Sequence, residues 1–117
     1  MATGGPAPRI YFTAVDPLGQ TVEVTRWRWA HAVKGHPVML GQEQMVKHAI
    51  ENPETIHEGN TAYDKVFKGY RILGRGFMYG GMYPIVVVRY HFRGVGDLRT
   101  AYLSAGAPRA KVLWTHP

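Results

Sequence analysis

The residues best suited to chemistry lie in the run WRWAHAVKGHP at residues 27–37. Two histidines, His31 and His36, stand there beside two tryptophans and two cations. An imidazole changes its protonation state near neutral pH, so a histidine can act as a general acid or base. Arginine and lysine can hold a phosphate group. The run therefore favours proton transfer next to a bound phosphate.

A second group lies near the other end of the chain, in the run RTAY at residues 99–102. Because side chains alternate along a strand, Thr100 and Tyr102 share one face and Arg99 points to the other. If their face borders the cleft below the first helix, the two hydroxyls can meet His31. Histidine, cations and hydroxyl groups together are typical of small ribonucleases that use no metal.

These residues also have a purely structural interpretation. His36, beside Pro37, is expected above all to fix a turn, and Thr100 and Tyr102 are common residue types in strands. A metal site is not expected, because the chain has no cysteine, no HExxH motif and no acid close in sequence to His31 or His36.

The formal net charge is +6, and the cations gather in the second half of the chain. Residues 65–99 contain seven Lys or Arg and one acid, whereas residues 51–64 contain four acids and no Lys or Arg. This distribution favours a polyanionic partner, although cations also solubilise the outer face of a sheet. The candidate phosphate contacts, in different predicted strands, are Lys65, Arg71, Arg89 and Arg99.

Hydrophobic periodicity predicts an α+β fold. Alternating residues indicate a hairpin of residues 9–15 and 21–27, followed by helical turns at residues 29–34. An apolar stripe predicts a helix at residues 41–52, which ends before Pro53. Strands are then expected at residues 55–58, 61–63, 66–73, 85–92, 98–104 and 111–114. We expect one or two helices to pack on one face of a twisted, four-stranded antiparallel sheet.

The length of 117 residues fits one domain, which we place at residues 9–117 after a flexible lead-in at residues 1–8. The lack of cysteine excludes disulfides and thiolate zinc sites. The longest apolar run, residues 84–88, is far shorter than the ~20 residues of a membrane span, and the N-terminus has no apolar signal core. We therefore expect no membrane association. The lead-in is typical of a free terminus or of a cut-point in a longer chain.

Three motifs together suggest a family. They are Trp27, His31 and His36-Pro37, then the helix end AIENPETI at residues 49–56, and finally the RTAY run. This pattern resembles the phage and polymorphic-toxin branch of the barnase/EndoU/colicin/RelE-like nuclease superfamily, over residues 19–114. The family often has an acidic residue after the His-Pro pair, where this chain has Val38.

The resemblance implies helices followed by a four-stranded antiparallel sheet, and RNA cleavage without a metal or other cofactor. It carries over His31, an early-strand cation (Lys65 or Arg71), and Thr100 with Tyr102 as catalytic residues. We expect an endoribonuclease toxin domain in which His31 takes the 2′-hydroxyl proton or protonates the leaving 5′-oxygen. The product is then a 2′,3′-cyclic phosphate. The expected RNA-binding residues are His36, Lys65, Arg89 and Arg99.

RNA is one expected partner, and the other is an acidic immunity or antitoxin protein that covers the cleft. The expected location is the cytoplasm of the producing or the target bacterial cell, reached in the second case as the end of a larger secreted protein. Other classes stay open: a non-catalytic RNA- or DNA-binding module, a phage or mobile-element accessory protein, or an enzyme of nucleotide chemistry such as ADP-ribosyl transfer.

Overall fold

The chain starts with two strands and then forms its helices. A computed structural model describes residues 9–72, 80–91 and 94–117. A hairpin of β1 (Ile10–Val15) and β2 (Thr21–Thr25) leads into α1 (Arg26–Gly35), the short 3₁₀ helix η1 (Pro37–Met39) and α2 (Glu43–Glu51). The remaining elements are β3 (Thr55–Glu58), β4 (Asp64–Lys68), β5 (Tyr83–Tyr90), β6 (Gly96–Ser104) and β7 (Val112–Thr115).

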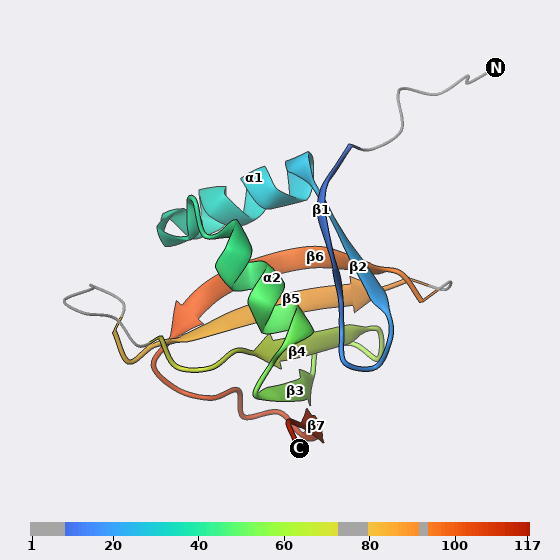
Figure 1. The fold of residues 1–117 in the computed structure, drawn as a ribbon, viewed down its shortest axis with the longest axis vertical. Coiled ribbons are helices and arrows are strands. Elements are labelled where there is room, and N and C mark those ends of the chain that lie inside the picture. Colours follow the sequence, from blue (N-terminus) through green and yellow to red (C-terminus); the bar gives the residue numbers. More distant parts are fainter. Residues whose placement is uncertain (1–8, 73–79, 92–93) are drawn as a thin grey trace.

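The strands form one mixed sheet of seven, in the order β1-β2-β6-β5-β4-β3-β7 (Figure 1). The predicted α+β class is confirmed, but the predicted four-stranded antiparallel sheet is wrong in size and in one pairing. The hairpin joins the sheet, because β2 pairs in parallel with β6 through Val22–Gly96 and Glu23–Asp97. On the far side, β7 pairs with β3 and forms the other edge.

The first helix begins at Arg26, whereas the predicted hairpin ends at residue 27, so the two overlap by two residues. The Thr25 hydroxyl accepts a hydrogen bond from the Arg28 backbone N–H at 3.2 Å, which is a typical N-cap. Arg26 and Trp27 therefore belong to α1 and not to the preceding strand. In α2 the predicted apolar stripe is buried through Val46, Ala49 and Ile50.

The two faces of the sheet have different neighbours. The helices supply core residues such as Trp29 and Met39, which pack with Val86 and Val88 of β5 on one face. Figure 1 shows α2 lying across the strands and α1 running beside β6. The opposite face, which we call the open face, carries the alternate residues of each central strand.

Other predicted boundaries differ at glycines and turns. The strand predicted at residues 61–63 is a turn, in which the Tyr63 backbone N–H bonds the Thr61 hydroxyl. The strand predicted at residues 66–73 runs from Asp64 to Lys68 and stops before Gly69, where a Cβ would meet Pro84 at 2.5 Å. The predicted lead-in at residues 1–8 lies outside the described residues, as do residues 73–79 and 92–93. None of the described helices is long and apolar enough to cross a membrane.

Candidate functional site

The open face gathers several of the predicted site residues in register. Thr100 and Tyr102 share it as predicted, because they pair with Val87 and Ile85 of β5. A bulge between Leu98 and Thr100 leaves Arg99 outside the regular pairing. Continuing across the sheet, Ile85 pairs with Lys68 of β4. Tyr102, Ile85 and Lys68 therefore form one row across three strands.

His36 lies against Tyr102, with 5.4 Å between the ring centroids and 35° between the ring planes. His36 caps the C-terminus of α1, where its backbone N–H donates to the Ala32 carbonyl, and Pro37 then begins η1. α1 reaches Tyr102 because it runs beside β6 beyond the short β2 pairing. The half-buried imidazole thus lies at the rim of the open face.

His31 lies elsewhere, on the exposed side of α1. Its ring stacks on Trp27 at 5.4 Å with 10° between the planes, and Trp27 is 65% exposed. The structure records no contact between His31 and Thr100 or Tyr102 within the described residues. The catalytic role expected of His31 therefore stays a prediction, while His36 is the histidine that meets the predicted tyrosine.

Lys65 points away from the open face, to the side of the sheet that the helices cover. Its Nζ donates to Gln20 Oε1 at 3.2 Å and lies 4.9 Å from the centroid of the Tyr90 ring. The register explains this direction, because Lys65 pairs with Val88, a core residue of the helix-covered face. Lys65 is therefore not on the same face as Thr100 and Tyr102.

The cation in the same cross-strand row as Tyr102 is Lys68, which is not among the predicted site residues. It is 5% exposed, forms an ion pair with Glu54, and places Nζ 3.7 Å from the centroid of the Tyr83 ring. Burial lowers the pKa of Lys68. The alternation of β4 around the buried Phe67 was the signal that could have placed Lys68 on the open face.

Arg71 completes a cationic cluster with Lys68, Tyr83 and Glu54. Its Nη2 donates a hydrogen bond of 2.9 Å to the Tyr83 hydroxyl. This hydrogen bond lowers the pKa of Tyr83, because the guanidinium favours the phenolate. Tyr83 pairs with Ser104, so it is a diagonal neighbour of Tyr102 on the open face.

The other end of the open face is a network of balanced charges. Arg89 binds Asp64 through Nε to Oδ1 at 2.8 Å and through Nη2 to Oδ2 at 3.3 Å. The Arg89 hydrogen bond lowers the pKa of the buried Asp64 carboxyl. Arg28 of α1 pairs with Asp97 at 3.2 Å, and His91 Nε2 lies 3.7 Å from the same carboxylate.

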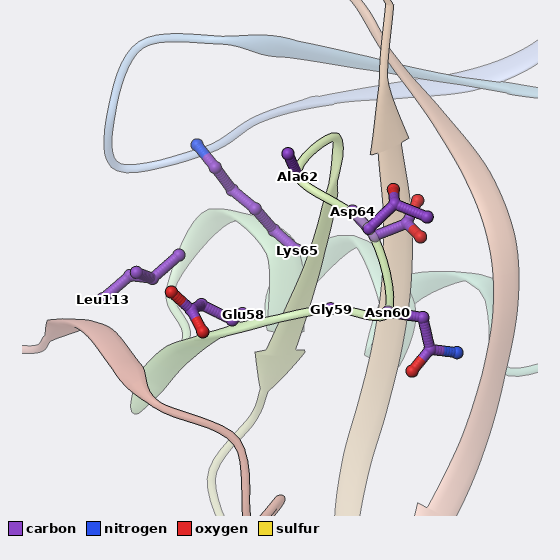
Figure 2. Close-up of a pocket in the computed structure, with 8 residues that line it drawn as sticks. Glu58, Gly59, Asn60, Ala62, Asp64, Lys65 and Leu113 are labelled. Carbon is purple, nitrogen blue, oxygen red and sulfur yellow. The ribbon is translucent and has the colours of Figure 1, made fainter.

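A pocket of about 470 Å³ lies around the turn between β3 and β4 (Figure 2). Lys65 lines it, but His31, Arg71, Thr100 and Tyr102 do not. Figure 2 shows Lys65 extending to one side of this turn and Asp64 to the other, as their alternation in β4 requires. The described residues contain no group of three or more His, Cys, Asp or Glu that could hold a metal ion.

Comparison with known protein families, with curated proteins and with solved structures gave no match. Nuclease-superfamily membership therefore stays a prediction from the sequence motifs.

Proposed function

We propose that this chain is an endoribonuclease toxin domain of the barnase/EndoU/colicin/RelE-like type, which cleaves RNA on the open face. The observation that carries the proposal is the contact of His36 with Tyr102, because it joins two of the motifs on which the resemblance rests. Lys68 lies on the same face, two strand spacings or about 10 Å from Tyr102. A proton-transfer group, hydroxyls and cations therefore border one surface.

In the proposed reaction, the ribose 2′-oxygen attacks the neighbouring phosphorus and the bond from phosphorus to the 5′-oxygen breaks. One group accepts the 2′-hydroxyl proton, and another donates a proton to the departing 5′-oxygen. The products are a 2′,3′-cyclic phosphate and a free 5′-hydroxyl. The imidazole of His36 suits either transfer near neutral pH, and RNA supplies its own nucleophile.

Lys68 and Arg71 have the charge that the reaction needs. Negative charge grows on the phosphate oxygens as the 2′-oxygen attacks, and preorganised cations stabilise it. Lys68 is held by Glu54 and the Tyr83 ring, whereas Arg71 is exposed and bound to the Tyr83 hydroxyl. We assign the phosphate to this cluster and not to Arg89, whose charge Asp64 already balances.

The same proposal includes an acidic immunity or antitoxin protein as partner. A ribonuclease with a net charge of +6 endangers the cell that makes it, and a negatively charged inhibitor would associate quickly with its basic surface.

The test is cleavage of total RNA in the presence of EDTA. We expect cleavage by the wild type and by His48→Ala, a control at an exposed histidine of α2, and a loss of about 100-fold or more for His36→Ala. Loss in His31→Ala with full activity in His36→Ala would move the reaction to the outer side of α1 and contradict the proposed site.

Intact RNA with folded wild-type protein would contradict the enzyme itself. Salt-sensitive RNA binding in that case would indicate a non-catalytic RNA-binding module, because phosphate contacts weaken as salt rises.

A further inference from the structure

A second pocket lies at the end of β5, whereas the cationic cluster of Lys68 and Arg71 lies at the start of the same strand. It has a volume of about 260 Å³ and is lined by Tyr63, Arg89, Tyr90 and His91. The Tyr90 backbone N–H donates to the Tyr63 carbonyl at 2.8 Å, so the turn before β4 and the end of β5 are joined at this pocket. Tyr63 is 65% exposed and the His91 side chain 59% exposed. Two flat rings are thus open to a ligand.

Arg89 lines this pocket, and its guanidinium has more hydrogen-bond donors than its recorded bonds use. A guanidinium has five N–H groups, and within the described residues Asp64 takes one from Nε and one from Nη2. The Asp64 side chain is only 5% exposed, whereas that of Arg89 is 39% exposed. The ion pair therefore holds the guanidinium in place, and the hydrogen bonds recorded among the described residues leave its Nη1 and Nη2 edge as a pair of parallel donors.

The surrounding charges disfavour an anionic ligand. Asp64 balances Arg89, and Asp97 balances Arg28 beside His91. The parallel pairing of β2 with β6 brings Glu23 next to Asp97. These carboxylates would repel a phosphate. A neutral ring with hydrogen-bond acceptors has no net charge for them to repel.

We propose that this pocket binds a guanine base of the RNA, stacked on Tyr63 or His91 and read by Arg89. Guanine offers two adjacent acceptors, O6 and N7, which match the two parallel donors of an arginine. Aromatic and histidine rings commonly stack unpaired RNA bases. This inference rests on the proposed function, since it assigns a base subsite to the same RNA substrate.

The pocket has a suitable place relative to the proposed cleavage site. Arg89 is four residues from Ile85, the partner of Tyr102, and both point to the open face. Four residues of strand span about 13 Å. The base that Arg89 binds is therefore not next to the reacting phosphate. It belongs to a nucleotide further along the bound RNA.

The test uses RNA that cannot be cleaved, so that binding is measured without catalysis. Fluorescein-labelled 2′-O-methyl uridine octamers would carry one central guanine, adenine, cytosine or 7-deazaguanine, and fluorescence anisotropy at one fixed salt concentration would give Kd. We expect guanine to bind about fivefold or more tightly than the other three bases. 7-Deazaguanine is decisive, because it keeps the ring system and lacks only the N7 acceptor.

Two variants separate the contributions of the pocket. Arg89→Lys keeps the positive charge and removes the pair of parallel N–H donors, so the guanine preference should disappear. The control Arg109→Lys, at an exposed arginine, should keep the guanine preference. Tyr63→Ala removes an exposed ring and should weaken binding of the guanine oligomer about fivefold or more. If Arg89→Lys does not fold, Tyr63→Ala and the 7-deazaguanine comparison in the wild type decide the question.

Equal binding of the four oligomers, a preference for cytosine, or a guanine preference that survives in Arg89→Lys would overturn the inference. These outcomes are distinct from failure of the proposed function. A protein that cleaves RNA without preferring guanine refutes the base subsite alone, whereas one that prefers guanine but leaves RNA intact refutes the nuclease alone.

Discussion

Replacing Lys68 with methionine should separate stability from activity. Lys68 is 5% exposed, and its ammonium group lies between the Glu54 carboxylate and the Tyr83 ring. Methionine keeps most of the apolar stem and removes the charge. The free energy of unfolding then changes through three contributions of different sign.

Removal of the buried charge is the favourable contribution, since burial of an ammonium costs several kcal/mol. The unfavourable ones are the lost ion pair and the lost cation–π contact, the latter about 0.5–2 kcal/mol. The Glu54 side chain is 39% exposed, so its carboxylate returns to water and is not left buried. We expect a net change between a loss of about 1 and a gain of about 2 kcal/mol.

Cleavage should fall by about 10²–10³-fold in the same variant, because one preorganised cation is lost from the phosphate site. Urea unfolding and initial rates on a labelled RNA oligomer measure the two quantities on one preparation. Glu54→Gln is the matched comparison: it leaves the ammonium buried without its carboxylate and should cost about 1–3 kcal/mol. A loss of more than about 3 kcal/mol in Lys68→Met, or cleavage at the wild-type rate, would refute the reasoning.

Two further predictions concern buried polar groups. Tyr90→Phe removes a hydrogen bond of 2.5 Å from the Tyr90 hydroxyl to Asp16 Oδ2 and should lower the free energy of unfolding by about 1.5–3 kcal/mol in urea; an unchanged value would contradict it. Arg89 lowers the pKa of Asp64 below its ordinary 3.8, so the ionised carboxylate stabilises the fold above about pH 4 and this contribution is lost as the pH falls through the folded-state pKa. The stability difference between wild type and Asp64→Asn should therefore shrink on acidification, and a difference that stays constant down to about pH 3 would show that ionisation of Asp64 does not matter.

The pattern of the sequence was sufficient for elements defined by local periodicity. The stripe of α2 and the alternation of β6 are properties of neighbouring residues, and the shared face of Thr100 and Tyr102 follows from the same alternation. The strand pairings could not be found in this way. Nothing local to β2 indicates that it lies parallel to β6, because such a pair depends on the path of the chain through the helices between them.

The positions of His31 and His36 could have been predicted from the helical spacing of α1, although the sequence motifs placed the expected reaction at His31. Trp29 and Ala32 are the buried residues of α1, and His36 follows them at spacings of seven and four. This helical spacing places His36 with the buried face and His31 with the exposed Trp27. Lys65 and Lys68 lie on opposite faces of the sheet, and the register of β4 against β5 decides which of them is on the open face. Alternation in the sequence gives the same answer only when Phe67 is already known to face the core.

The charges on the open face are divided between its two ends, and this division connects the two proposals. At the Tyr102 end, Lys68 pairs with the Glu54 carboxylate and Arg71 binds the Tyr83 hydroxyl, so a positive charge remains for a phosphate. At the other end, each arginine has its own aspartate, so hydrogen-bonding direction remains but little net charge. An RNA strand carries both kinds of group, charged phosphates and neutral bases, and the two ends differ in the way that such a ligand requires. A partner that offered negative charge alone would use the first end and gain nothing from the second.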